Sequence, residues 1–108
     1  MLSLERRPTA VICLNSGLLL GSKMAALEHR LRIPSDISLT GMTESTMTES
    51  PLLRNITSIS FPIPSAAAEA VRVIMRSIDN RQNDRPDELV TTGFNARTYW
   101  ADSIATLA

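Results

Sequence analysis

The sequence predicts an α/β fold in which short parallel strands alternate with helices, and two patterns support this class. Short unbroken apolar runs, typical of strands buried on both faces, precede longer segments whose apolar residues recur every three or four positions, as on one face of a helix. Successive runs leave room for one helix between them, which a right-handed connection between parallel strands requires. We therefore expect two strand–helix–strand units within the 108 residues, without a visible domain boundary.

The first strand–helix–strand unit is expected near the N-terminus. Ala10–Leu14 is apolar and contains β-branched side chains, which predicts a buried strand. Gly17–Leu31 follows as a helix, and Pro34 ends this segment because proline cannot continue a helix. Ile37–Met42 is the next predicted strand. The expected buried stripe of the helix has spacings of four, three and four residues and consists of Leu20, Met24, Leu27 and Leu31.

The second unit is expected after a polar loop, Met42–Ser50, in which the motif Met-Thr-Glu-Ser occurs twice. Ile56–Phe61 is the third predicted strand. Pro62–Ser65 opens a second helix, since proline is well tolerated in a first helical turn, and Leu89–Arg97 is the last strand. The second helix is expected to bury Ala67, Ala70, Val71, Ile74 and Ile78 and to expose Arg72, Arg76 and Arg81.

Composition and charge exclude several classes of function. Apolar residues make up 44% of the chain and charged residues 20%, which is ordinary for a globular domain. Eleven basic residues balance eleven acidic ones without a basic run, which argues against a dedicated nucleic-acid-binding module. The longest apolar stretches, residues 9–14 and 17–21, are too short to cross a bilayer, and the N-terminus lacks the apolar core of a signal peptide. We expect a cytoplasmic chain with no membrane partner.

Catalytic and metal-binding patterns find little support. Ser16 lies on a strand-to-helix turn, but the first glycine of a nucleophile elbow is missing, and His29 precedes the acidic positions that a hydrolase triad would need. Cys13 is better explained as a small core residue than as a nucleophile, and a single cysteine forms neither a disulfide framework nor a thiolate metal site. We expect no enzyme, no metal site and no cofactor.

Polar residues that follow the first two strands are the candidate binding site. In an open parallel sheet, ligands bind beyond the carboxyl ends of the strands. Asn15 and Ser16 follow the first strand, and Thr43 and Glu44 follow the second. In the alternative interpretation the first pair only caps the helix and the second pair starts a solvated loop, and spacing alone favours this alternative. Trp100 could stack on a ligand, although packing against the sheet edge is the simpler explanation.

Longer stretches of the sequence resemble the lactose/galactose-repressor family of bacterial transcription regulators. Residues 7–15 read RPTAVICLN where the family has RPTAVFCAN, and residues 31–41 read LRIPSDISLTG where it has LRVPEDVSVVG. Residues 56–62 are similar to the family's LTTVRQP strand, and residues 91–97 to its closing PTRLVERGS strand. The resemblance runs from about Arg7 to Thr98 in unbroken order, and the matching spacing of the four segments makes it specific.

The resemblance implies a periplasmic-binding-protein type I fold, with two α/β lobes and an effector in the cleft between them. Residues 1–108 correspond to the C-terminal portion of this fold, so we expect it to be incomplete. Residues up to about Gly41 and the last strand would belong to the C-terminal lobe, and residues from about Ile56 to Asn80 to the N-terminal lobe. The face of the Ala67–Ile78 helix would then lack its cover. DNA is expected to be bound only through the family's N-terminal helix-turn-helix domain, which lies outside this portion.

The resemblance also implies site residues, with departures from the family pattern. Asn15 keeps an effector-contacting asparagine, whereas Ser16 stands where the pattern has aspartate. Arg30 replaces a helix-terminating glycine, so we expect the helix to end without the usual left-handed cap. Each carboxylate acceptor that is lost in this way leaves a hydroxyl group of a bound sugar without a hydrogen-bond partner, which costs about 1–3 kcal/mol of binding free energy for each buried group. The expected effector-binding residues are Asn15, Ser16, Thr43 and Glu44, with Phe61 and Trp100 as aromatic walls.

A homodimer is a further implication of the resemblance. In the family, the helix after the Asn15 turn contributes to a dimer interface, and Leu18, Leu19 and Leu20 give this helix more apolar surface than one core-facing stripe uses. We therefore interpret the chain as the effector-binding and dimerisation portion of a regulator of this family, which binds a small molecule such as a sugar or related polyol. The alternatives are a sugar-binding protein of a transport system, which shares the fold, and a gene remnant without a ligand.

Overall fold

The computed structural model describes residues 5–106, and within this part of the chain two compact units are distinguished. One unit comprises the residues up to Phe61 together with those from Ala96 onward, and the other comprises Pro62–Asn95. The expectation of a chain without a boundary is therefore wrong. The chain leaves the first unit directly after Phe61 and re-enters it at Ala96. Because no separate polar linker lies at either crossing, no change in composition marks the boundary.

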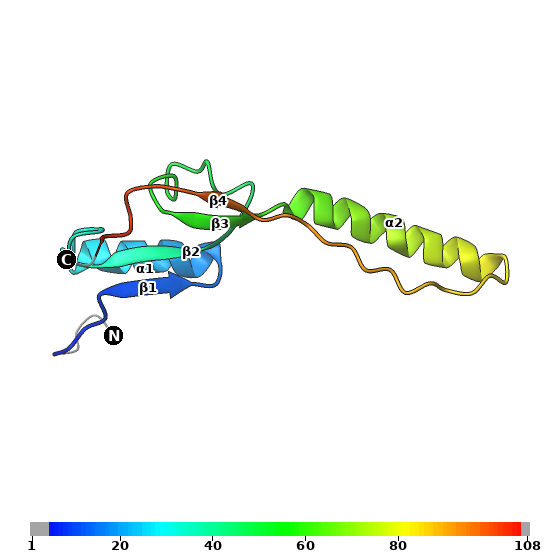
Figure 1. Ribbon diagram of the computed structural model, residues 1–108, viewed down its shortest axis with the longest axis horizontal. Coiled ribbons are helices and arrows are strands. Elements are labelled where there is room, and N and C mark those ends of the chain that lie inside the picture. Colours follow the sequence, from blue (N-terminus) through cyan, green and yellow to red (C-terminus); the bar gives the residue numbers. More distant parts are fainter. Residues whose placement is uncertain (1–4, 107–108) are drawn as a thin grey trace. The chain divides into compact units, whose positions relative to one another are not determined.

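The first unit is built on a mixed sheet, which confirms the predicted α/β class (Figure 1). Among the described residues the strands lie in the order β1-β2-β3-β4. β1 (Ala10–Cys13), β2 (Ser38–Glu44) and β3 (Ser58–Phe61) pair in parallel, and β4 (Arg97–Tyr99) pairs antiparallel with β3. Helix α1 (Ser16–Glu28) connects β1 to β2 and packs on both strands. The first predicted strand–helix–strand unit is thus confirmed.

The last strand differs from its prediction over Leu89–Arg97. Residues 89–96 have no regular secondary structure, and Leu89 is 97% exposed. These residues belong almost entirely to the second unit, which among its described residues offers no strand for them to pair with. A strand forms only from Arg97 onward, where the chain has re-entered the first unit beside β3. The resemblance assigned residues from about Ile56 onward to another lobe, and for β3 this assignment is wrong, because β3 belongs to the same sheet as β2.

Helix α1 begins as the sequence predicts but buries a different face. Asn15 is its N-cap, and its side-chain Oδ1 accepts a hydrogen bond from the Leu18 backbone N–H at 2.8 Å. The predicted stripe is wrong, since Met24 and Leu27 are exposed whereas Leu19 and Ala26, seven residues apart, are buried. Three consecutive leucines allow several apolar stripes, and the sheet selects the stripe that contains Leu19.

The C-terminus of α1 corrects the expectation that Arg30 removes the left-handed cap. Arg30 itself adopts the left-handed conformation, with φ of 56°. The Arg30 N–H donates to the Leu27 carbonyl at 2.9 Å, and the Leu31 N–H donates to the Ala26 carbonyl at 2.8 Å. These bonds are the two bonds of a Schellman motif, so arginine fills the position in which glycine is usual.

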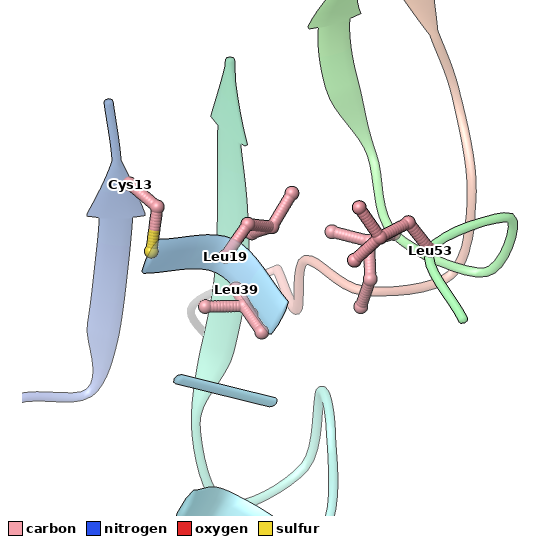
Figure 2. Packing of buried hydrophobic residues seen from close by; sticks show 5 residues of the cluster. Cys13, Leu19, Leu39 and Leu53 are labelled. Carbon is pink, nitrogen blue, oxygen red and sulfur yellow. The ribbon is translucent and has the colours of Figure 1, made fainter. Parts of the chain in front are cut away.

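The core of the first unit lies between α1, the sheet and the segment before β3 (Figure 2). Its buried members are Cys13, Leu19, Leu39, Leu53 and Ile56. Cys13 is therefore a core residue, and its thiol donates a hydrogen bond to the Ser22 hydroxyl at 3.3 Å. Leu53 comes from the turns that follow β2, so this part of the connection contributes to the core.

The segment after β4 closes the sheet through Ser103, which is fully buried. Its hydroxyl donates to the Leu39 carbonyl at 2.7 Å and accepts from the Thr57 N–H at 2.8 Å. The Ser103 carbonyl accepts from the Leu39 N–H at 2.8 Å. Pairing between β2 and β3 begins only at Gly41 and Ser58, so Ser103 satisfies backbone groups that lie before this point.

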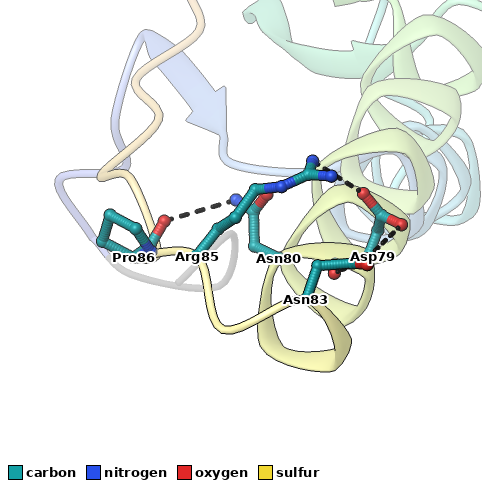
Figure 3. Close-up of polar contacts among 5 residues, drawn as sticks. All are labelled: Asp79, Asn80, Asn83, Arg85 and Pro86. Carbon is teal, nitrogen blue, oxygen red and sulfur yellow. Dashed lines mark hydrogen bonds and ion pairs between the residues drawn. The ribbon is translucent and has the colours of Figure 1, made fainter.

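The second unit consists of helix α2 (Ile63–Gln82) and the chain that returns along it. Polar contacts of Asp79 with Asn83 and Arg85 join the end of the helix to the turn (Figure 3). Farther along, Arg81 forms an ion pair with Asp87 at 3.0 Å. These contacts hold a tight reversal of the chain.

The predicted burial of the apolar face of α2 is wrong. No residue of α2 is buried, and Val71, Ile74 and Ile78 are all exposed. The segment that returns along α2 is one extended, mostly polar stretch of chain, so it covers only part of the helix surface.

Replacing Ser103 with alanine tests the closure of the sheet. We expect Ser103→Ala to lower the free energy of unfolding by about 1–3 kcal/mol, because the Thr57 N–H and the Leu39 carbonyl lose their partner while staying buried. Urea unfolding followed by circular dichroism measures this loss, and exposed Ser35 provides the control, whose replacement by alanine should change stability by less than about 0.5 kcal/mol. Equal midpoints for the two variants would contradict the role of Ser103.

Replacing Arg30 with glycine tests its left-handed conformation. A non-glycine residue with positive φ is strained, and glycine relieves the strain at some cost in the entropy of the unfolded chain. We expect Arg30→Gly to raise the free energy of unfolding by about 0.5–1 kcal/mol. Arg30→Ala is the matched control, because it removes the same side chain but keeps Cβ and should not stabilise the protein. Equal stability of the two variants would show that the backbone conformation is not strained.

Candidate functional site

The carboxyl ends of β1, β2 and β3 form one edge of the sheet, which carries most of the predicted effector residues. Cys13 pairs with Gly41, and Glu44 pairs with Phe61. When the β1–β2 register is continued past Cys13, Asn15 comes level with Thr43. We call this edge, with Asn15, Ser16, Thr43, Glu44 and Phe61, the carboxyl rim.

Ser16 and Glu44 are directly bonded across the carboxyl rim. The Ser16 hydroxyl donates a hydrogen bond to Glu44 Oε2. This bond lowers the pKa of the Glu44 carboxyl, a backbone hydrogen bond lowers it further, and partial burial opposes both. Glu44 is therefore ionised at neutral pH, and its charge lies next to the first residue of α1, where the helix dipole favours an anion.

Asn15 fulfils the structural role that spacing alone favoured, because its Oδ1 caps α1. Its side chain is exposed, and its amide NH2 makes no hydrogen bond with another described residue. The amide donors therefore face solvent at the rim. The cap and a contact to a ligand are compatible, since they use different atoms of one side chain.

Thr43 does not start a solvated loop, because it is the penultimate residue of β2 and only 3% exposed. Among the described residues its hydroxyl is buried without a hydrogen-bond partner. Its neighbour across the sheet, Ser60, is buried too. Thr43 thus lies beneath the rim rather than on its surface, where the hydroxyl could not touch a ligand without rearrangement.

The structure brings Phe61 to the carboxyl rim and places Trp100 away from it. Phe61 is half-buried beside Glu44. Trp100 follows Tyr99, which pairs with Ser58 at the start of β3, so it lies about 13 Å along the sheet from Phe61. The prediction that Trp100 forms a wall of the same site is wrong, because β4 runs antiparallel and carries its last residues to the opposite edge.

Arg97 is a rim residue that sequence reasoning missed. It is the first residue of β4, it is exposed, and it pairs with Ser60, one position before the end of β3. Its place depends on the antiparallel direction of β4. No local pattern in the sequence indicates that direction.

The other chemical candidates are not assembled into sites. Ser16 begins α1 and His29 is its C-cap, so they lie about 20 Å apart along the helix axis. Within residues 5–106, no three histidine, cysteine, aspartate or glutamate side chains gather as metal ligands would. In the same part of the chain, no helix combines the length and apolar character needed to cross a membrane.

The predicted dimer residues differ in exposure. Leu18 is 55% exposed, Leu20 packs partly against the core, and Leu19 is completely buried. Leu19 is therefore a core residue of this chain and offers no surface to a partner. Of the three leucines predicted at a dimer interface, Leu18 has the most solvent-accessible surface, and it stays the candidate contact residue.

Comparison with known proteins agrees with the resemblance seen in the sequence. The family described as periplasmic binding protein-like domain matches residues 1–98. The HTH-type transcriptional repressor PurR of Vibrio campbellii is 29% identical over 85 residues, which cover 77% of this chain and 25% of PurR. The chain thus spans about a quarter of the length of this curated relative. The predicted resemblance to lactose/galactose-repressor regulators is confirmed, and the chain belongs to the periplasmic binding protein-like domain family.

Proposed function

We propose that the chain is the effector-binding portion of a cytoplasmic transcription regulator of the lactose/galactose-repressor type, with no catalytic activity of its own. The observation that carries this proposal is the Ser16–Glu44 pair, which fixes an ionised carboxylate at the carboxyl edge of a parallel sheet. This edge is where ligands of open α/β sheets bind. The similarity to a transcriptional repressor supports a regulator rather than a transport protein.

The chemistry of the carboxyl rim suits a sugar or polyol. The Glu44 carboxylate accepts hydrogen bonds from hydroxyl groups, and the free amide of Asn15 donates them. Phe61 offers an apolar surface for the carbon–hydrogen face of a sugar ring. Among the described residues the rim is one edge of a single sheet, whereas small ligands are normally buried on most of their surface. We therefore expect this chain by itself to bind an effector no more tightly than about millimolar.

Partners follow from the same proposal. DNA would be reached only through a DNA-binding domain outside this portion of the regulator, and the chain itself would associate with a second copy. Exposed apolar residues on both units, among them Leu18 of α1 and Ile74 of α2, give such an association its surface.

Titration with a panel of monosaccharides and purines tests the effector site. We expect weak, saturable binding of a sugar, measured by nuclear magnetic resonance shifts at the rim, and a loss of at least tenfold in affinity in Glu44→Gln. Asn15→Asp keeps the helix cap but removes the amide donors, so it should weaken binding without lowering stability. Trp100→Ala is the matched control and should bind normally. Binding that survives Glu44→Gln but fails in Trp100→Ala would place the site elsewhere.

Light scattering tests the association with a second copy. At tens of micromolar we expect a mass above that of the monomer, and Leu18→Gln should shift the equilibrium toward the monomer because it removes exposed apolar surface. Leu19→Ala should instead destabilise the fold by about 2–5 kcal/mol, since it opens a cavity in the core. A clean monomer mass for the unmodified chain would refute self-association.

A further inference from the structure

A hollow lies at the opposite end of the sheet from the carboxyl rim. It has a volume of about 780 Å³ and is bordered by the C-terminal half of α1, the segment before β2, the residues before β3 and the segment after β4. All of these segments belong to the first compact unit. We call this hollow the basal groove, and its lining includes Lys23, Leu27, Arg30, Ile33, Ile56 and Asp102.

The basal groove has an apolar floor. Ile56 is buried in the core, Ile33 packs against the core, and Leu27 is exposed although it is a large aliphatic side chain. Leu27 thus keeps apolar surface in solvent that a ligand could cover. The volume lies within the range of about 300–1,000 Å³ that is usual for small-molecule sites.

The charges around the groove leave one net positive charge. Arg32 also borders the groove, but Asp36 holds its guanidinium through bonds of 2.8 and 3.0 Å and so cancels its charge. The Lys23 ammonium bonds only a neutral group, the Leu52 carbonyl, at 2.5 Å. Arg30 forms no hydrogen bond or ion pair through its side chain with another described residue. With Asp102 counted, Lys23 and Arg30 leave a surplus of one positive charge.

The backbone of Arg30, which contributes part of this positive charge, is held in place at the end of α1. Its backbone is held in the left-handed conformation by the two hydrogen bonds that end α1. Glycine would adopt this conformation without strain, whereas arginine adds a guanidinium at the border of the groove. Guanidinium groups bind carboxylates with two parallel hydrogen bonds.

We propose that the basal groove binds a small organic anion with an aliphatic chain, of the class of medium-chain carboxylates. The carboxylate lies between Lys23 and Arg30, and the chain covers Leu27, Ile33 and Ile56. One carboxylate neutralises the surplus charge, and the aliphatic chain removes the exposed apolar surface from water. This site is independent of the proposed effector site, because it lies at the other end of the parallel strands.

Octanoate is the probe for the experiment, with octanol as a neutral molecule of equal chain length and acetate as the same head group without the chain. Calorimetric titration of the full chain below micelle-forming concentrations should give saturable binding of octanoate, with octanol and acetate at least tenfold weaker. Chemical shifts of backbone amides should move at the groove residues and stay unchanged at Asn15 and Glu44.

Variants separate the groove from general apolar binding. Arg30→Gly and Lys23→Met should each weaken octanoate binding at least fivefold, and the loss in Arg30→Gly cannot come from unfolding if that variant is more stable, as expected above. Arg76→Met, on exposed α2, is the matched control and should bind octanoate normally. The proposal is overturned if octanol binds as tightly as octanoate, or if both groove variants bind octanoate normally. It is also overturned if the amide chemical-shift changes appear on α2 instead of at the groove, or if a second copy of the chain occupies the groove and prevents octanoate binding.

Discussion

The sheet depends on one buried hydroxyl group that is far from its partners in the sequence. Ser103 is 64 residues from Leu39 and 46 residues from Thr57, yet its side chain joins β2 to the segment that leads into β3. Without it, backbone groups before the paired part of these strands would be buried and unsatisfied. The first unit therefore cannot be completed until the chain has passed through the whole second unit and returned, which makes its closing contacts strongly non-local.

The geometry of the carboxyl rim also depends on the polar contacts that join β2 to β3. Glu44 reaches the edge of the sheet as the last residue of β2, and Phe61 stands beside it only because β2 and β3 are paired in register. Ser103 and the Thr57 hydroxyl, which accepts from the Ala101 N–H at 2.9 Å, fix the other end of the same two strands. The geometry at one edge of the sheet is thus held by polar contacts at the other edge, rather than by the few residues of the rim.

Local patterns predicted the features that depend on neighbouring residues. The apolar run of β1, the Asn15 cap and the rule for carboxyl ends were enough to place Ser16 near Glu44. The remaining features depend on distant parts of the chain. Three successive leucines do not show which stripe of α1 meets the sheet, so Leu19 was misplaced. The direction of β4 is decided by its pairing with β3, and only that pairing separates Trp100 from the rim and brings Arg97 to it.

The formal net charge of the chain is zero, but the two ends of the sheet carry opposite local charges. At the carboxyl rim, Ser16 stabilises an ionised glutamate, which favours ligands that donate hydrogen bonds and opposes anions close to it. At the basal groove, Arg32 and Asp36 cancel each other, and the lysine and arginine that remain exceed Asp102 by one charge. Because physiological salt screens exposed charges beyond roughly 8 Å, the charges close to each end of the sheet determine its electrostatics, rather than the net charge of the whole chain. A neutral polyol and an organic anion would therefore be sorted to opposite ends of one small sheet.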